Sequence, residues 1–240
     1  MIGLIEFPDG ISWELKYNSG ADFFGSTFHI ENVTGLYSNQ SRRCVDIKFD
    51  ASNMTSMGNM FYNDPYLVKV SHLDTSNATV LDSLFSNCGR LLYVPHINTS
   101  KATSIYGIFY NCNYLTKIPQ LDTSNVTNMS SLFSSCSRLT SIPLLDCSKV
   151  TSIGSMFGWT NITALTDLGG FKNLKINCTG SLNLLPNLTI QSLMNVINNL
   201  YDFRANGETT TRTLQLGTTN LNKLTDEQKA VATNKGWNLT

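Results

Sequence analysis

The chain has 240 residues, of which 41% are hydrophobic and only 14% are charged, and its 17 cationic and 17 anionic side chains cancel. This balance argues against a nucleic-acid-binding protein, because neutralising phosphates needs clustered Lys and Arg. No run approaches the roughly 18 consecutive apolar residues of a membrane span, so we expect no membrane insertion. Residues 1–20 lack the features of a secretory signal, which predicts a chain that is made in the cytoplasm and released by another route.

Residues 1–48 are expected to form an N-terminal cap or an attachment region. They are rich in aromatic residues and glycine, and "FPDGISWELKY" (7–17) suggests a β-hairpin. Tyr37 lies 24 residues before the first regular phenylalanine of the repeats and is a candidate for a degenerate first repeat, although little else between 25 and 48 matches.

Residues 49–168 read as five copies of one 24-residue unit. The unit is clearest in "LDTSNVTNMSSLFSSCSRLTSIPL" (121–144), and the other copies are expected at 49–72, 73–96, 97–120 and 145–168 without insertion or deletion. A fixed period of roughly 20–29 residues with Leu, Ile and Phe anchors is typical of a leucine-rich-repeat solenoid. One phenylalanine recurs at the same position of every copy: Phe61, Phe85, Phe109, Phe133 and Phe157.

Each copy is predicted to contain a strand, a turn and a helical arm, which makes the fold class α/β. Apolar residues in "VTNMSSLFSSC" (126–136) have helical spacing, so this segment is expected to be a short helix or a 3₁₀-rich turn. "LTSIPLL" (139–145) is β-prone and is expected to pair in parallel with its equivalent in the next copy. One copy buries too few side chains to offset its conformational entropy, so the copies must stack to fold.

Three of the six cysteines, Cys88, Cys112 and Cys136, occupy the same position of successive copies. Parallel stacked side chains have poor geometry for a disulfide, so we expect a column of buried, reduced thiols. The other cysteines have no mutual spacing of the CxxC kind, and a zinc site is not expected.

Residues 169–240 are expected to form a last coil and a C-terminal α/β cap, because the repeat frame dissolves there and new patterns begin. Thr225 and Gln228 have the spacing of a capping box, which predicts the start of a helix at this point. The expected elements are a strand-like last coil at "FKNLKI" (171–176), a helix in 189–203 with Leu193, Val196, Ile197 and Leu200 on one face, a strand and a glycine turn in 211–220, and a helix that opens with Thr225 and Gln228 and ends near Gly236.

The segment "TSNVTNMSSLFSSCSRLTSIP" (123–143) and its copies resemble the bacterial surface leucine-rich repeats of the BspA or Treponema type, and still more their variant in mycoplasma surface lipoproteins and gut bacteria. The resemblance covers about half of the chain. The tail from residue 188 to 237 looks like the C-terminal cap that follows such repeats in proteins of intestinal bacteria and their phages. Members of this family are taken to bind host or partner surfaces rather than to catalyse, so the resemblance implies no catalytic residue.

The adhesive role that the resemblance implies, joined to the missing export signal, predicts a virion protein. We expect a phage tail, fibre or decoration protein that binds glycan or protein on a gut bacterial host. It would also contact neighbouring virion proteins, and it could be a homo-oligomer. Two alternatives stay open: a purely structural virion protein, and a bacterial cell-surface or extracellular adhesin that is exported without a classical signal.

No sequence motif points to catalysis, because nucleophile elbows, P-loops and paired carboxylates are not found. His72 and His96 close consecutive copies, and a paired-His metal site at one-coil separation is conceivable. A solvent-facing turn is the favoured interpretation, because no acidic residue or further histidine shares that position in the other copies. We expect neither an enzyme nor a bound metal or cofactor.

The variable positions of the predicted strands carry the candidate binding residues. They are not core anchors, so we expect them on one solvated face. Aromatic rings with adjacent Arg suit sugar stacking and protein binding, and the alternative is that they only solubilise the surface. The candidates are Tyr66, Arg90, Tyr114 and Arg138 at position 18 of the copies, and Lys69, Tyr93 and Lys117, followed by Ser141, at position 21.

Overall fold

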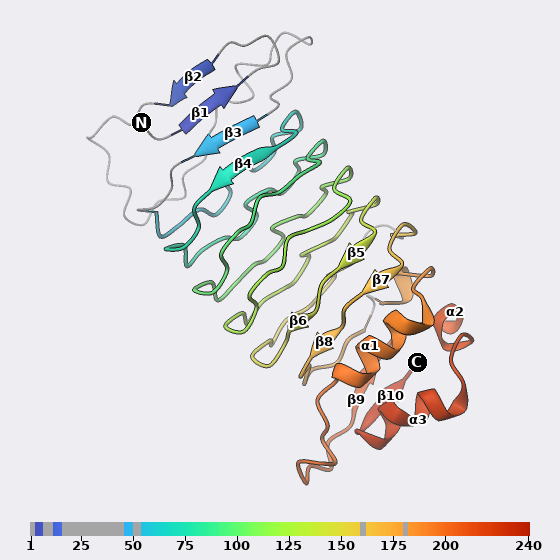
Figure 1. Cartoon of the computed structure of the whole chain (residues 1–240). Helices are drawn as coiled ribbons and strands as arrows, with labels where there is room; N and C mark the ends of the chain where they lie inside the picture. The colour runs from blue at the N-terminus through green and yellow to red at the C-terminus, as the bar shows by residue number, and fades with distance from the viewer. Residues whose placement is uncertain (1–2, 7–11, 16–45, 50–53, 159–161, 180–181) are drawn as a thin grey trace.

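A computed structural model describes residues 3–6, 12–15, 46–49, 54–158, 162–179 and 182–240, so the candidate repeat residue Tyr37 lies outside the described residues. The first two strands, residues 3–6 and 12–15, pair antiparallel as in a hairpin. The hairpin is expected within residues 7–17, and the first strand lies before that segment. The third strand pairs in parallel with the fourth, so the sheet continues into the repeats. The sheet has the order β2-β1-β3-β4 (Figure 1) and consists of β1 (Gly3–Glu6), β2 (Ser12–Leu15), β3 (Asp46–Phe49) and β4 (Val70–Leu73).

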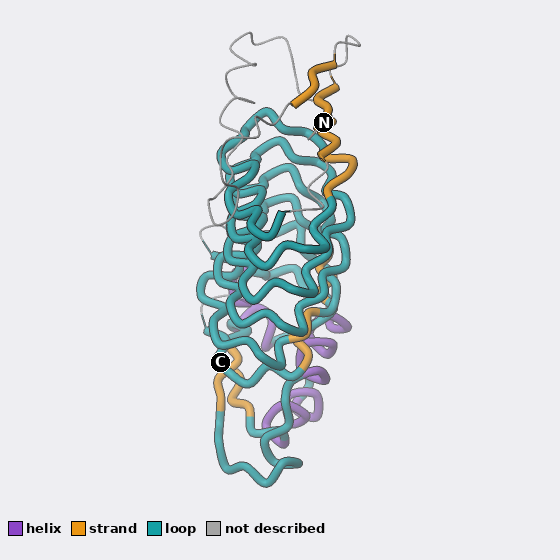
Figure 2. Tube along the Cα trace, turned by 90° about the vertical axis from the view of Figure 1, so that its left-hand side faces the viewer, coloured by secondary structure: helices purple, strands orange, loops and turns teal. Residues whose placement is uncertain are grey.

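From residue 54 to residue 158 the chain winds in coils that stack on one another along one axis (Figures 1 and 2). Parallel bridges join equivalent residues of successive copies, so each copy forms one coil and its equivalent positions lie side by side. One series of bridges connects Ser56, Val80, Ser104, Asn128 and Ser152. Further bridges on the strand side connect Lys69 with Tyr93 and Lys117 with Ser141.

The arms of the copies contain no helix between residues 54 and 158, so of the two predicted forms the short helix is absent and the turn with 3₁₀-type hydrogen bonds is present. They are runs of turns, closed by hydrogen bonds from an N–H to the carbonyl three residues earlier. Ser131 and Ser135 have φ values of 56° and 63°, and Asn, Ser or Gly residues at the equivalent positions are also left-handed. A left-handed residue interrupts the hydrogen-bond ladder of a right-handed helix. The freed N–H groups donate to the next coil, as that of Phe133 does to the carbonyl of Met156 (2.9 Å).

The strand side of the later coils consists of two-residue strands. β5 (Ser141–Ile142) pairs with β7 (Asp167–Leu168), and β6 (Leu145–Asp146) pairs with β8 (Phe171–Lys172), both in parallel. The paired residues Ser141 and Asp167 are 26 positions apart instead of 24. The fifth coil is therefore two residues longer than the uninterrupted frame predicts.

The core runs along the axis of the stack. Five buried phenylalanine rings stack in one column, with centroids 5.3 to 6.2 Å apart, and buried Leu, Ile and Met side chains surround them. This confirms the register that the sequence predicts for Phe61, Phe85, Phe109, Phe133 and Phe157. Because each inner ring contacts one ring above and one below, every coil depends on its neighbours for a complete core.

A column of buried cysteines runs beside the rings, which confirms the predicted burial of Cys88, Cys112 and Cys136. Each Sγ donates a hydrogen bond to the carbonyl of a phenylalanine in the preceding coil, at 3.0, 3.1 and 2.9 Å. Burial raises the pKa of the Cys136 thiol to about 12 and holds the pKa values of the other two well above their usual range. In the first copy the same position holds Asp64, which is also buried.

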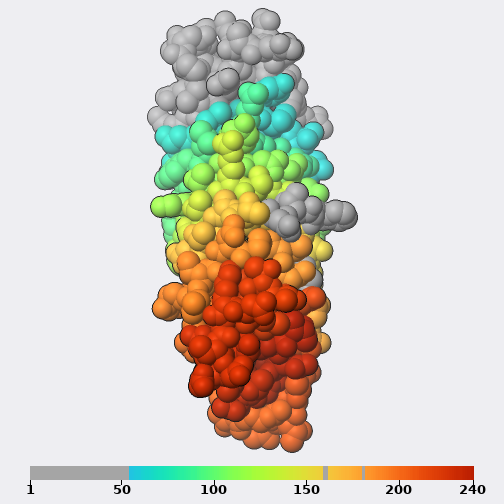
Figure 3. All heavy atoms as spheres, turned by 90° about the vertical axis from the view of Figure 1, so that its right-hand side faces the viewer, coloured from blue at the N-terminus to red at the C-terminus, as the bar shows by residue number. Residues whose placement is uncertain are grey.

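A C-terminal cap covers the other end of the stack (Figure 3). α1 (Ile190–Asn199) lies against β7 and β8, where the next coil would otherwise be. The Ser192 hydroxyl accepts from the Leu168 N–H and donates to the Thr166 carbonyl, both at 3.0 Å, which satisfies the edge of the last coil. The other elements are η2 (Leu182–Leu184), β9 (Arg212–Leu214), α2 (Thr218–Leu221), α3 (Asp226–Asn234) and β10 (Trp237–Leu239), with β9 and β10 parallel.

The local predictions for this cap are largely confirmed. α1 buries Leu193, Val196 and Ile197 on one face, and the capping box between Thr225 and Gln228 is present at the start of α3. The strand β10 was not predicted. No helix within the described ranges is both long enough and apolar enough to cross a bilayer.

Candidate functional site

The seven candidate residues lie on the strand side of four consecutive coils and form one surface. Leu139 and Ile142 are buried in the core, while Arg138 is exposed. Six of the seven are exposed and Lys69 is half-buried. We call this surface the basic–aromatic stripe: Tyr66, Lys69, Arg90, Tyr93, Tyr114, Lys117 and Arg138.

The structure pairs cations and rings of the stripe across neighbouring coils. The Cζ of Arg138 lies 4.1 Å from the ring centroid of Tyr114, and the Cζ of Arg90 lies 5.5 Å from that of Tyr66. The Nζ of Lys69 lies 5.9 Å from the ring of Tyr93. Such contacts stabilise exposed sites by about 0.5–1 kcal/mol each. The ring face that contacts a cation is occupied, so on that face these rings position the cations.

The stripe carries positive charge without carboxylates in the same strand segments. The segments 65–72, 89–96, 113–120 and 137–144 each contain one Lys or Arg and no Asp or Glu. Asp167 pairs with residue 141 in the next coil and is exposed, so it ends the stripe at the fifth coil. Four positive charges therefore lie along four coils.

Two carboxylates that follow the strand segments are engaged in the adjacent turns. Asp122 and Asp146 accept hydrogen bonds from the backbone N–H and the hydroxyl of Ser124 and Ser148. The hydrogen bonds from Ser124 hold the pKa of Asp122 below its usual range. Burial raises the pKa of Asp146, but hydrogen bonds from Ser148 and Lys172 outweigh it, so this pKa is also lowered. Both groups are therefore charged at neutral pH and stabilise their turns.

Several cations outside the stripe have structural partners among the described residues. Lys101 and Lys149 donate to asparagine side chains of the preceding coil, at 2.7 and 2.6 Å. Lysine and arginine side chains of the cap donate mainly to backbone carbonyls. By contrast, Arg90, Lys117 and Arg138 hydrogen-bond to none of the described residues. Their donor groups are available to a ligand.

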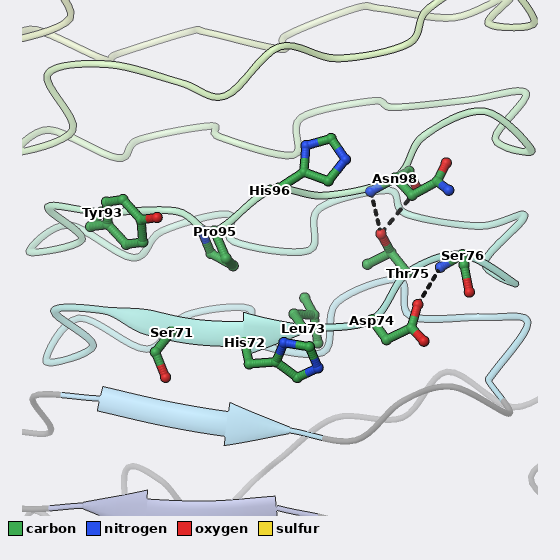
Figure 4. Close-up of a pocket in the computed structure, with 10 residues that line it drawn as sticks. All are labelled: Ser71, His72, Leu73, Asp74, Thr75, Ser76, Tyr93, Pro95, His96 and Asn98. Carbon is green, nitrogen blue, oxygen red and sulfur yellow. Dashed lines mark hydrogen bonds between the residues drawn. The ribbon is translucent and has the colours of Figure 1, made fainter.

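A shallow cavity of about 400 Å³ opens beside the stripe, between two neighbouring coils (Figure 4). Tyr93 and His96 line it from one coil, and His72 lines it from the coil before. The Thr75 hydroxyl donates to the Asn98 carbonyl and accepts from the Asn98 N–H, at 3.0 and 2.6 Å, which ties the coils together at this point. The cavity extends the stripe next to Tyr93.

The two histidines are exposed on adjacent coils, as the solvent-facing interpretation expects for His72 and His96. Within the part of the chain that the structure describes, no group of three or more His, Cys, Asp or Glu side chains is placed to hold a metal ion. The imidazoles contribute polar groups to the cavity wall.

Sequence reasoning missed Leu92, which lies between Arg90 and Tyr93 and is 52% exposed. Only a weak signal in the sequence indicates that this position is exposed: the equivalent residues of two later copies are the polar residues Thr116 and Thr140. An exposed leucine beside an exposed tyrosine adds apolar contact area to the stripe.

Comparison with known proteins gives one family match. The model described as "Mycoplasma protein of unknown function, DUF285" matches residues 31–116 and 92–173, which together span more than half of the chain. No curated protein matches the chain, and no solved structure does.

Proposed function

The chain belongs to the family described as "Mycoplasma protein of unknown function, DUF285", and we propose that it is a non-enzymatic recognition protein that binds glycan or protein on a bacterial surface through the basic–aromatic stripe. One observation carries this proposal: Arg90, Lys117 and Arg138 are exposed and make no hydrogen bond to a described residue. Leu92 and Tyr93 add exposed apolar area among them. Arginine and tyrosine are enriched among the residues that dominate binding energy in interfaces.

We also propose that the stacked coils are a leucine-rich-repeat solenoid. The 24-residue period, the parallel bridges between equivalent positions and the aromatic column support this assignment. Such a stack presents variable positions as long columns on one side, which is the geometry that an extended recognition surface requires.

Binding of the purified full chain to a panel of bacterial cells tests the proposed function. The stripe variant is Tyr93→Ala with Tyr114→Ala, and the matched control is Tyr62→Ala with Tyr106→Ala, which removes two exposed tyrosines outside the stripe. We expect the stripe variant to be retained less than the wild type and the control to be retained equally. Equal retention of all three proteins would rule out the stripe as the binding surface.

We propose two alternative locations for the protein, a phage particle and a bacterial cell surface. In a particle, the chain would also contact neighbouring virion proteins. Mass spectrometry of purified particles and of washed envelope fractions from the source culture separates these locations. A purely structural role in the particle predicts the chain in particles together with no binding of the free chain to any cell.

A further inference from the structure

We propose that the ligand of the basic–aromatic stripe is an acidic polysaccharide, whose chain runs along the stack and whose anionic groups bind Arg90 and Arg138. This inference rests on the proposed function and narrows its ligand from any surface glycan or protein to one chemical class. Charge is the first argument: the stripe has one cation in each of four coils and no carboxylate in the same segments.

The state of the two arginines is the second argument. Each guanidinium packs on a tyrosine of the preceding coil, Arg90 on Tyr66 and Arg138 on Tyr114, and neither hydrogen-bonds to a described residue. The ring restrains the guanidinium while its N–H edge stays available. A planar fork held in this way suits bidentate binding of a carboxylate, sulfate or phosphate group.

The spacing of the two arginines is the third argument. They occupy the same position two coils apart, and neighbouring strands are about 4.8 Å apart, so the anions that they bind would recur about every 9.6 Å. This is comparable to the length of one disaccharide in an extended polysaccharide. A polymer with one acidic group in each disaccharide would place an anion at each arginine and a neutral sugar between them.

The exposed apolar residues beside Arg90 fit the same ligand. Leu92 and Tyr93 are each 52% exposed and lie in the same coil as Arg90. Sugar rings present C–H groups that can contact such side chains. Each strand of a DNA duplex carries a phosphate about every 3.4 Å along the helix axis, a charge density that two arginines at the spacing above do not match.

The test measures binding of the full chain to defined polymers. The probes are hyaluronan oligosaccharides, with a carboxylate on every second sugar, alginate oligosaccharides, with a carboxylate on every sugar, carboxyl-reduced forms of both, and an oligothymidylate. We expect binding to an acidic oligosaccharide that is lost on carboxyl reduction and weakens as salt is added. Binding that survives carboxyl reduction, or tighter binding to the oligothymidylate, would overturn the inference.

The variant pair is R90Q/R138Q, and the control is K101Q/K149Q. Both remove two positive charges two coils apart, but the control lysines bind asparagine side chains outside the stripe. We expect R90Q/R138Q to bind the acidic oligosaccharide roughly tenfold or more weakly and the control to bind like the wild type. R90K/R138K, which keeps the charge but loses the fork, should be intermediate. Equal losses in stripe and control variants would contradict the inference, and circular dichroism checks that all variants fold.

The cell-binding experiment keeps the two proposals apart. Retention on cells that needs Tyr93 and Tyr114 but not the two arginines would overturn the acidic ligand and leave the recognition function standing. Failure of the chain to bind any cell or polymer would count against both.

Discussion

The Sγ of Cys136 donates a hydrogen bond to the backbone carbonyl of Phe109, 2.9 Å away in the preceding coil. Cys112 makes the same bond to Phe85, so thiols and ring-bearing residues are linked from coil to coil. Both sulfur atoms are buried, and their pKa values are raised because burial disfavours the thiolate. The column therefore consists of protonated thiols that act as core side chains and hydrogen-bond donors.

This geometry predicts that the thiols of the column are unreactive in the native protein. Alkylation needs the thiolate and access to it, and Cys136 has a pKa of about 12 and no exposed surface. We expect iodoacetamide at pH 8 to leave the peptides of Cys88, Cys112 and Cys136 unmodified, and to modify all three in denaturant. Peptide mass spectrometry reads each site separately, and rapid native labelling of Cys136 would contradict the prediction.

The stack of rings predicts a large effect at its centre. Phe109 contacts Phe85 and Phe133, with centroids 6.1 and 6.2 Å away, so its loss damages the packing with two coils. We expect Phe109→Ala to lower the free energy of unfolding by about 3–5 kcal/mol in urea denaturation. The exposed Tyr106 lies in the same arm, and Tyr106→Ala should change this value by less than about 0.5 kcal/mol. Similar values for the two variants would contradict the central role of the ring column.

The left-handed turns predict which residues position 107 accepts. Gly107 has φ +57°, and a Cβ there would meet its nearest atoms at an ordinary 3.6 Å, so only the backbone conformation restricts substitution. Ser131 adopts the same conformation in the next coil. We expect Gly107→Val to lower the free energy of unfolding by about 1–2 kcal/mol more than Gly107→Ser does, because β-branched residues tolerate this region least. Thermal denaturation compares the two, and equal stability would argue against a conformational restriction.

The lowered pKa values of Asp122 and Asp146 predict acid destabilisation. A carboxyl whose pKa is lower in the folded than in the unfolded state stabilises the fold above its unfolded pKa, and this contribution is lost as the pH falls through the folded pKa. We therefore expect the free energy of unfolding to decrease as the pH falls below the ordinary carboxyl value of 3.8. Asp146→Asn should flatten this decrease. Identical pH profiles of variant and wild type would exclude Asp146 as a contributor.

The columns of the core could be predicted because repetition multiplies each local signal. A single phenylalanine at 109 says little, but five at one spacing define which side chains share a column. The same holds for the cysteines and for the stripe, whose residues were identified by their variable positions between anchors. The capping box at Thr225 could be predicted because its geometry is local.

For the arms, the spacing of the apolar residues left two alternatives, a short helix and a 3₁₀-rich turn. Met129, Leu132 and Phe133 have helical spacing, and a run of turns also directs them inward. The informative residues were Ser131 and Ser135, whose equivalents are Asn, Ser or Gly in the described copies and adopt left-handed φ. The contact of Arg138 with Tyr114 depends on side-chain rotamers of neighbouring coils, which spacing does not determine.

The ring column of this protein repeats with every coil, but position 18 of the stripe repeats with every second coil. Tyr66 and Tyr114 alternate with Arg90 and Arg138, whereas the ring column has the same residue throughout. Removing one 24-residue copy, such as 97–120, would leave the ring column continuous and bring two arginine coils together without the intervening tyrosine. Gene duplication in units of one copy can therefore lengthen the core. Only duplication of pairs of copies also keeps the alternation of tyrosine and arginine along the stripe.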